Sequence, residues 1–177
     1  MTKIEERIKG TIRDIPDFPK EGIIFKDITP ILKDPNLIRD IIDGFKFKFE
    51  NNNIAAIVGI ESRGFIFGMP LALAMNIPFV PVRKKGKLPA DVLSVEYDLE
   101  YGSAILEIHS DALAKDDKVI VCDDLLATGG TATATAELVE MLGGVVEGYA
   151  FVVELEFLNG RNSLKNICNN IYSLANY

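Results

Sequence analysis

Two adjacent carboxylates, Asp123 and Asp124, stand between an apolar run and a pair of glycines. Residues 119–131 read VIVCDDLLATGGT, a pattern that predicts a buried strand, an acidic edge, a short turn and a helix start. The free N–H groups and the dipole of a helix start attract anions, and Gly129 and Gly130 let backbone approach a ligand closely. Carboxylates repel phosphate, so we expect this acidic pair to meet sugar hydroxyls or metal-bound water. The segment therefore predicts a site for a sugar phosphate.

A plainer interpretation is a capped helix preceded by solvated acids. The fixed order of strand, acids and threonine-rich helix start favours a ligand site over that interpretation. No GxGxxG follows a strand and no GxxxxGK[ST] is present, which argues against dinucleotide and P-loop chemistry.

Two further loops carry cations directly after apolar runs. Residues 61–64 (ESRG) follow residues 54–60, and the basic residues of RKKGKLP follow residues 79–82. Loops that follow parallel strands meet at the carboxyl edge of a sheet, so these loops should converge on residues 123–131. The basic loop could instead be solvated, and Arg63 could pair with Glu61 or a helix end. Convergence favours a ligand with phosphate at both ends and a sugar between them.

The elements that position these loops alternate between strand and helix. The pattern predicts helices at residues 4–12, 36–49, 65–75 and 130–141, and strands at 54–60, 79–82, 119–122, 145–154 and 171–174. The proline-rich residues 14–30 are expected to form an ordered loop, and residues 94–108 an exposed hairpin turning at residues 101–103. We expect one α/β domain with a central parallel sheet and helices on both faces.

The composition of the chain excludes some classes of binding partner. A net charge of −7 argues against a nucleic-acid surface, and two cysteines indicate reduced thiols, with Cys122 in the core. The charged, helical pattern of residues 1–10 is not the one expected of a signal peptide. Residues 65–82 lack charge but contain three prolines, so we interpret them as core and expect no membrane contact. The single histidine, His109, is expected to have a structural role. One histidine and two distant cysteines are not expected to form a metal cluster.

Residues 119–131 resemble the phosphoribosyl-diphosphate signature of type I phosphoribosyltransferases. Within that superfamily, the chain resembles the adenine phosphoribosyltransferase family from about residue 14 to about residue 155. Four more blocks carry this resemblance in the family's order, namely residues 17–35 (DFPKEGIIFKDITPILKDP), 61–68 (ESRGFIFG), 82–89 (VRKKGKLP) and 97–113 (YDLEYGSAILEIHSDAL). The resemblance implies a type I phosphoribosyltransferase-like single domain over residues 1–177. It also implies an N-terminal arm and base-binding hood at about residues 1–35, and a flexible hairpin lid at about residues 94–108.

The resemblance implies a reaction of purine salvage, in which adenine and 5-phosphoribosyl diphosphate give AMP and diphosphate. It implies Mg²⁺ as cofactor, held mainly by substrate and water near Asp123 and Asp124 with no direct protein cage. It further implies a cytoplasmic homodimer. A non-catalytic phosphoribosyl-diphosphate sensor and an enzyme for another purine base are the alternatives. A sensor usually carries an added DNA-binding module, for which this acidic chain has no room.

The resemblance also implies roles for individual residues. The phosphoribosyl group and AMP would meet Asp123, Asp124, Ala127, Thr128, Gly129, Gly130 and Thr131. The diphosphate would meet Glu61, Ser62, Arg63, Arg83, Lys84 and Lys87, with Arg83 and Lys87 often reaching across a dimer interface and the Glu61–Ser62 peptide typically cis. Adenine would meet Ile24, Phe25, Lys26 and Leu125.

Two catalytic roles follow from the same resemblance. Arg63 would stabilise charge as it develops on the leaving diphosphate. Glu100, in LEYG, matches the family's acid/base residue near the purine, although an exposed turn acid is the plainer interpretation. Lys26 stands where many members have arginine, and it would donate to a ring nitrogen without a planar guanidinium.

Overall fold

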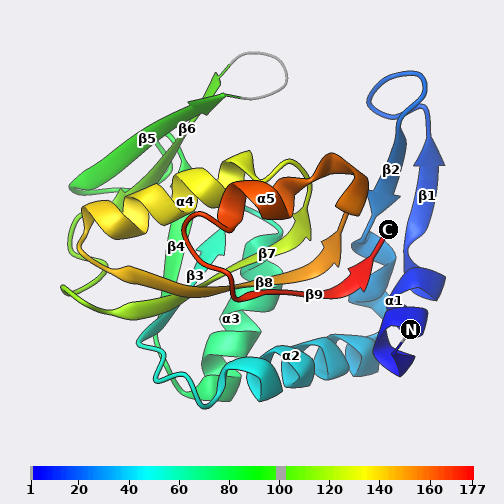
Figure 1. Ribbon diagram of the computed structural model, residues 1–177, viewed down its shortest axis with the longest axis horizontal. Helices are drawn as coiled ribbons and strands as arrows, with labels where there is room; N and C mark the ends of the chain where they lie inside the picture. Colours follow the sequence, from blue (N-terminus) through cyan, green and yellow to red (C-terminus); the bar gives the residue numbers. More distant parts are fainter. Residues whose placement is uncertain (1, 99–102) are drawn as a thin grey trace.

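A seven-stranded sheet forms the centre of the molecule (Figure 1). The computed structural model describes residues 2–98 and 103–177, and all the elements below lie within them. The strands lie in the order β5 (Val92–Asp98), β6 (Ser103–His109), β4 (Phe79–Lys84), β3 (Ala56–Ile60), β7 (Lys118–Leu126), β8 (Val145–Glu154) and β9 (Ile171–Asn176). From β4 to β9 neighbouring strands are parallel, as predicted, whereas β6 pairs antiparallel with both β4 and β5.

Helices cover both faces of this sheet, which confirms the predicted α/β architecture. The helix α4 (Gly130–Met141) and the short α5 (Gly160–Leu164) lie on one face, and α2 (Pro35–Phe49) and α3 (Gly64–Met75) on the other (Figure 1). α1 (Lys3–Thr11) packs beside β9 and α2. The short α5 and the 3-10 helix η2 (Glu156–Leu158) were not expected from the sequence.

The central strand β7 is apolar from Val119 to Cys122, where it is buried on both faces. Val119 and Val121 belong to the core cluster under α4, whereas Ile120 and Cys122 belong to the cluster under α2 and α3. Successive side chains point to opposite faces, so a strand buried on both faces needs apolar residues at every position. β7 continues through the acidic pair to Leu126, and the expected turn therefore begins later than predicted.

The hood contains regular structure that the sequence analysis missed. β1 (Arg13–Pro16) and β2 (Ile24–Asp27) form a two-stranded antiparallel sheet, and the 3-10 helix η1 (Thr29–Lys33) follows. Pro16 ends β1, Pro19 lies in the connection and Pro30 lies in η1; Phe18–Pro19 is cis, and Gly22 in the connection has a φ of +85°. The prediction of an irregular loop at residues 14–30 was wrong, because proline is tolerated at the end of an edge strand.

The predicted hairpin is present, but it is not a separate exposed flap. β6 extends the main sheet at Arg83↔Glu107 and Lys84↔Leu106, and Val95, Leu106 and Ile108 are buried in the core. Its turn, including Glu100 and Gly102, lies outside the described residues.

The uncharged run at residues 65–82 forms part of α3 and β4, as predicted. Among the described residues, no helix combines the length and the apolar character that crossing a bilayer requires. Cys122 is buried in β7 and Cys168 is half-buried, and both are unpaired thiols.

Candidate active site

The strand-end loops converge on one cavity of about 480 Å³ at the carboxyl edge of the sheet. Its lining combines the turn after β3, the acidic pair and the loop after β7. The lining residues are Ile60, Glu61, Ser62, Arg63, Lys84, Tyr97, Leu106, Asp123, Asp124, Leu125, Ala127 and Thr131. The convergence predicted from the strand order of the sequence is therefore observed. Ile60, Tyr97 and Leu106 were not predicted, because they belong to strands and carry no binding motif.

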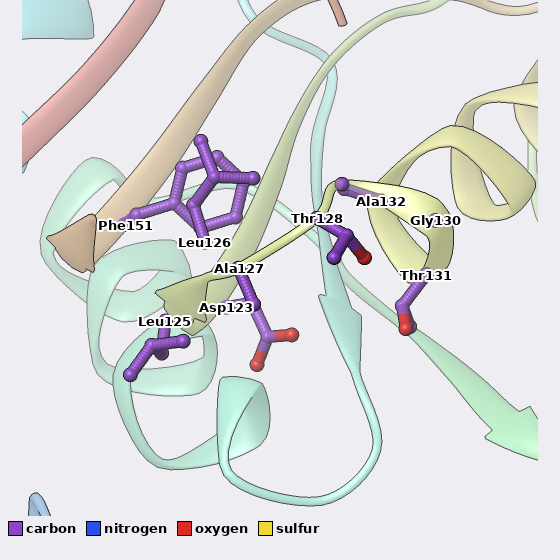
Figure 2. Close-up of a pocket in the computed structure, with 10 residues that line it drawn as sticks. Asp123, Leu125, Leu126, Ala127, Thr128, Gly130, Thr131, Ala132 and Phe151 are labelled. Atoms are coloured by element: carbon purple, nitrogen blue, oxygen red, sulfur yellow. The ribbon is translucent and has the colours of Figure 1, made fainter. Parts of the chain in front are cut away.

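A smaller cavity of about 80 Å³ adjoins the glycine loop, which we define as residues 127–131. Figure 2 shows the oxygen-bearing side chains of Asp123, Thr128 and Thr131 around this loop, and Leu126 and Phe151 of the apolar core behind it. Gly129 has a φ of +88°, a conformation that favours glycine. No described side chain caps the start of α4, whose first residues line this cavity, so their free N–H groups are available to an anion.

The two acids of the pair have different surroundings. Asp124 is buried, and its Oδ2 lies 2.8 Å from Nε of Arg63. The Asp124 N–H donates to Oδ1 of Asp123 at 2.8 Å. Burial, and then the negative charge of Asp124, raise the pKa of Asp123 well above its usual value. The site thus holds one ion-paired carboxylate beside one that retains its proton more readily.

The turn after β3 lies directly against β7. A side chain at Gly64 would come within 2.6 Å of the Cys122 carbonyl oxygen, so only glycine allows α3 to begin at this point. This close approach brings Arg63, the residue before α3, beside Asp124. Glycine in ESRG therefore serves packing, and arginine serves the electrostatics of the cavity.

Arg63 also connects the cavity to the hood. Its guanidinium carbon lies 5.9 Å from the centre of the Phe25 ring. Phe25 points to the site side of β2, and Ile24 at the start of that strand is more than half exposed. Neither residue lines the main cavity, although Leu125 does.

Lys26 does not point toward the cavity. Its Nζ donates to Oδ1 of Asp14 at 2.8 Å and lies 4.1 Å from the centre of the Tyr177 ring. Successive residues of a strand face opposite sides, so Lys26 and Phe25 point away from each other. The expectation that Lys26 donates to a base therefore differs from the observed geometry.

The basic loop, residues 83–87, is held in place by two glutamates. Glu61 accepts from Nη2 of Arg83 at 3.2 Å and from the Lys84 N–H at 2.8 Å, and the buried Glu107 accepts from the Gly86 N–H at 2.8 Å. Burial would raise the pKa of Glu61, but these partners outweigh it and hold the pKa below its usual value.

Within this loop, only Lys84 lines the cavity. Lys87 is exposed, and Arg83 donates to its carbonyl oxygen at 3.1 Å. His109 contacts the Pro89 carbonyl oxygen at 2.7 Å, which fits the structural role expected for it.

Comparison with known proteins identifies the family. Residues 27–154 match the phosphoribosyl transferase domain. The adenine phosphoribosyltransferase of a Synechococcus species is 57% identical over 170 residues, covering 96% of this chain and 98% of the relative. The chain belongs to the adenine phosphoribosyltransferase family. Its type I phosphoribosyltransferase fold is likewise that of the relatives, because the Thermoanaerobacter pseudethanolicus enzyme superposes with a TM-score of 0.92 at 52% identity, covering 97% of this chain and 99% of that one.

A second adenine phosphoribosyltransferase structure carries ligands. The Saccharomyces cerevisiae enzyme, complexed with an imino-altritol bisphosphate and adenine, superposes with a TM-score of 0.92 at 43% identity, covering 98% of this chain and 99% of that one. The Glu61–Ser62 peptide of this chain is cis, as expected for an adenine phosphoribosyltransferase. The described residues contain no group of three acidic, histidine or cysteine side chains that could hold a metal ion by themselves.

Proposed function

We propose that this chain transfers the phosphoribosyl group of 5-phosphoribosyl diphosphate to adenine, giving AMP and diphosphate, in the single domain of residues 1–177. One observation carries the proposal, namely that the two ends of the glycine loop, the acidic pair and the ESRG turn line a common cavity. The relative from Saccharomyces cerevisiae that binds adenine together with a sugar bisphosphate supports it.

The glycine loop would hold the 5′-phosphate. The N–H groups at the start of α4 and the hydroxyls of Thr128 and Thr131 provide donors on the cavity side. Asp123 and Asp124 would accept from the ribose hydroxyls. One short segment, residues 123–131, would thus orient the sugar phosphate, with carboxylate acceptors for the hydroxyls and backbone donors for the phosphate.

Arg63 and the basic loop would bind the diphosphate. Arg63 is already paired with Asp124, so it would contact the diphosphate by exchanging one anion for the other. Arg83 is held by Glu61, which leaves the ammonium groups of Lys84 and Lys87 nearer to solvent and available for the leaving group. Negative charge moves to the diphosphate as the glycosidic bond breaks, and these cations would stabilise it.

Adenine would lie against the Phe25 ring and beside Leu125, with the backbone of Ile24 as a hydrogen-bonding edge. The proximity of Arg63 to Phe25 supports this, because the base must lie next to the anomeric carbon and the diphosphate. The geometry supports a role for Lys26 in holding the hood, at residues 1–35, and not in contacting the base.

The acidic pair fits a Mg²⁺ ion that is held mainly by substrate. Carboxylate oxygens and water are the donors that Mg²⁺ prefers, and it commonly takes one or two carboxylates together with substrate phosphates. Asp123 and Asp124 would meet the metal or its water ligands. When bound, the ion would neutralise charge on the diphosphate.

The hairpin at residues 94–108 is proposed as the lid, and Glu100 as the acid/base residue near the purine. The hydroxyl of Thr131 lies 3.4 Å from the Tyr97 hydroxyl, so β5 already reaches the glycine loop. A hairpin rooted in the sheet at β4 would close by moving its outer part over the cavity.

A cytoplasmic homodimer is proposed as the working form. α3 has no charged residue between Gly64 and Met75, and it exposes Met69 at 44% and Leu73 at 69%, one turn apart. Burying this apolar face against a second copy would stabilise a dimer. Light scattering should give twice the chain mass, and Leu73→Glu should shift it toward one chain mass; an unaltered mass in the variant would exclude α3 from the interface.

Turnover of adenine with 5-phosphoribosyl diphosphate, with and without Mg²⁺, tests the function. We expect AMP formation with Mg²⁺, little without it, and a loss of several orders of magnitude in Asp124→Ala, which also leaves Arg63 without its partner. Turnover of hypoxanthine or guanine but not adenine would overturn the substrate assignment. Binding of the diphosphate sugar without any turnover would instead support the sensor.

A further inference from the structure

The glycine loop rests on backbone from a distant part of the chain. A side chain at Gly160 would come within 2.1 Å of the Ala127 carbonyl oxygen and 3.0 Å of the Gly129 nitrogen. In the other direction, a side chain at Gly129 would come within 2.7 Å of the Gly160 carbonyl oxygen. Two glycines therefore face each other with backbone in contact, and Gly160 forms the rear wall of the loop.

A second contact ties the same short helix to the loop. The hydroxyl of Ser163 donates to the Thr128 carbonyl oxygen at 3.4 Å. In Figure 1, α5 lies alongside α4, whose first turn the glycine loop begins. Residues of the loop line the smaller cavity, and the Ala127 carbonyl oxygen and the Gly129 nitrogen lie next to Gly160 at the start of α5.

α5 is itself fixed by a partly buried ion pair. Arg161 contacts both carboxylate oxygens of the buried Glu154, with Nε 2.9 Å from Oε1, and Nη1 donates to the Ile171 carbonyl oxygen at 2.9 Å. The Ser173 hydroxyl donates to Oε2 of the same glutamate at 2.7 Å. This network joins the end of β8, the start of β9 and α5, so the position of Gly160 is determined by the sheet.

We propose that Gly160 is a positioning residue for the 5′-phosphate, and that the Glu154–Arg161 pair fixes it in place. The inference rests on the proposed role of the glycine loop. The loop must present several N–H groups to one phosphate, and displacement by about 1 Å is enough to weaken such an arrangement severely. α5 acts from behind the loop and touches no substrate.

Gly160→Ala tests the proposal most directly. Gly160 does not have a positive φ, so the added methyl group acts through its clash with the backbone of the glycine loop, at the Ala127 carbonyl and the Gly129 nitrogen. We expect KM for 5-phosphoribosyl diphosphate to rise about tenfold or more, while KM for adenine changes less than about twofold. Calorimetry with ribose 5-phosphate should show a matching loss of affinity.

Gly148→Ala is the matched control. A side chain at Gly148 would come within 2.8 Å of the Phe49 ring and 3.0 Å of the Asn170 carbonyl oxygen, but Gly148 lies in the first half of β8 and does not line the cavity. We expect it to lower thermal stability and leave KM for the diphosphate sugar unchanged. Equal rises in both variants would overturn the proposal, because the effect would then be general destabilisation.

A milder pair of variants guards against failure of Gly160→Ala to fold. Arg161→Lys keeps a cation beside Glu154, whereas Arg161→Ala leaves that buried carboxylate unpaired. The proposal predicts a larger rise in KM for the diphosphate sugar in Arg161→Ala, partial rescue in Arg161→Lys, and little change for adenine. If Gly160→Ala, Arg161→Lys and Arg161→Ala all turn over as fast as the wild type with an unchanged KM for 5-phosphoribosyl diphosphate, this inference alone is wrong. If the wild-type protein itself shows no turnover, the proposed function is wrong.

Discussion

Asp123 and Asp124 are neighbours in sequence, yet one is paired with Arg63 and the other is not. The raised pKa of Asp123 means that the native state retains a proton that the unfolded chain has already lost. Stability therefore falls as pH rises above the ordinary carboxyl range, until the native carboxyl has ionised. Near neutral pH, ionisation of Asp123 therefore lowers the stability of the ligand-free protein, and a bound cation would offset this cost.

Asp123→Asn should consequently stabilise the ligand-free protein at pH 8. The gain in unfolding free energy is expected to be clear at pH 8 and to shrink toward pH 4, where the carboxyl is protonated in both states. Urea unfolding at both pH values measures it. A gain of equal size at both pH values would contradict the ionisation argument, and AMP formation should fall in the same variant.

Lys26 offers a second test at this scale. If its ammonium holds the hood through Asp14 and Tyr177, then Lys26→Gln and Asp14→Asn should each raise KM for adenine by about threefold, and the double variant should add little. Steady-state kinetics of the four proteins measures the coupling. If Lys26→Gln raises KM for adenine strongly while Asp14→Asn leaves it at the wild-type value, Lys26 contacts the base.

Residue types predicted which segments line the cavity better than they predicted the contacts between individual side chains. The acidic pair, Arg63 and the glycine loop were found because their types and order after strands limit what they can bind. The ion pair of Arg83 with Glu61, the direction of Lys26 and the wall at Gly160 were not found. These depend on contacts between segments far apart in sequence, and no local pattern encodes such contacts.

At the scale of elements, β6 shapes the basic loop as well as forming the hairpin. Glu107 on β6 accepts from the N–H of Gly86, which lies in the turn of the basic loop and has a φ of +75°, a value that favours glycine. Glu107→Ala should loosen this turn and raise KM for 5-phosphoribosyl diphosphate about fivefold, equivalent to about 1 kcal/mol. Glu107→Gln, which keeps an acceptor oxygen, is the control and should remain near wild type; equal effects of both would point to lost charge.

Element prediction succeeded where burial is periodic and failed where it is not. α4 and β8 were predicted with the observed bounds, because their apolar residues are continuous or regularly spaced. The β1–β2 pair was missed, because its short strands are largely exposed and prolines flank them. Short exposed strands are stabilised by their partner strand, which sequence spacing does not reveal.

At the scale of the whole molecule, the alternation of strands and helices predicted the sheet but not the order of its strands. β3 pairs with β4, which follows it directly, and also with β7, which comes after the entire hairpin. Apolar strands look alike, so pattern alone does not say which pairs are neighbours. The order nevertheless decides the site, since β3 and β7 bring Arg63 and Asp124 together.

This strand order has a consequence for synthesis on the ribosome. All five residues of β3 are buried in the finished protein, but one of its edges stays unpaired until β7 emerges, since Ala56 pairs with Val119. An exposed apolar strand edge invites pairing with other chains. Nascent chains stalled before Lys118 should therefore be aggregation-prone and chaperone-dependent. Because the glycine loop directly follows β7, the segment that covers this edge also delivers the proposed phosphate site.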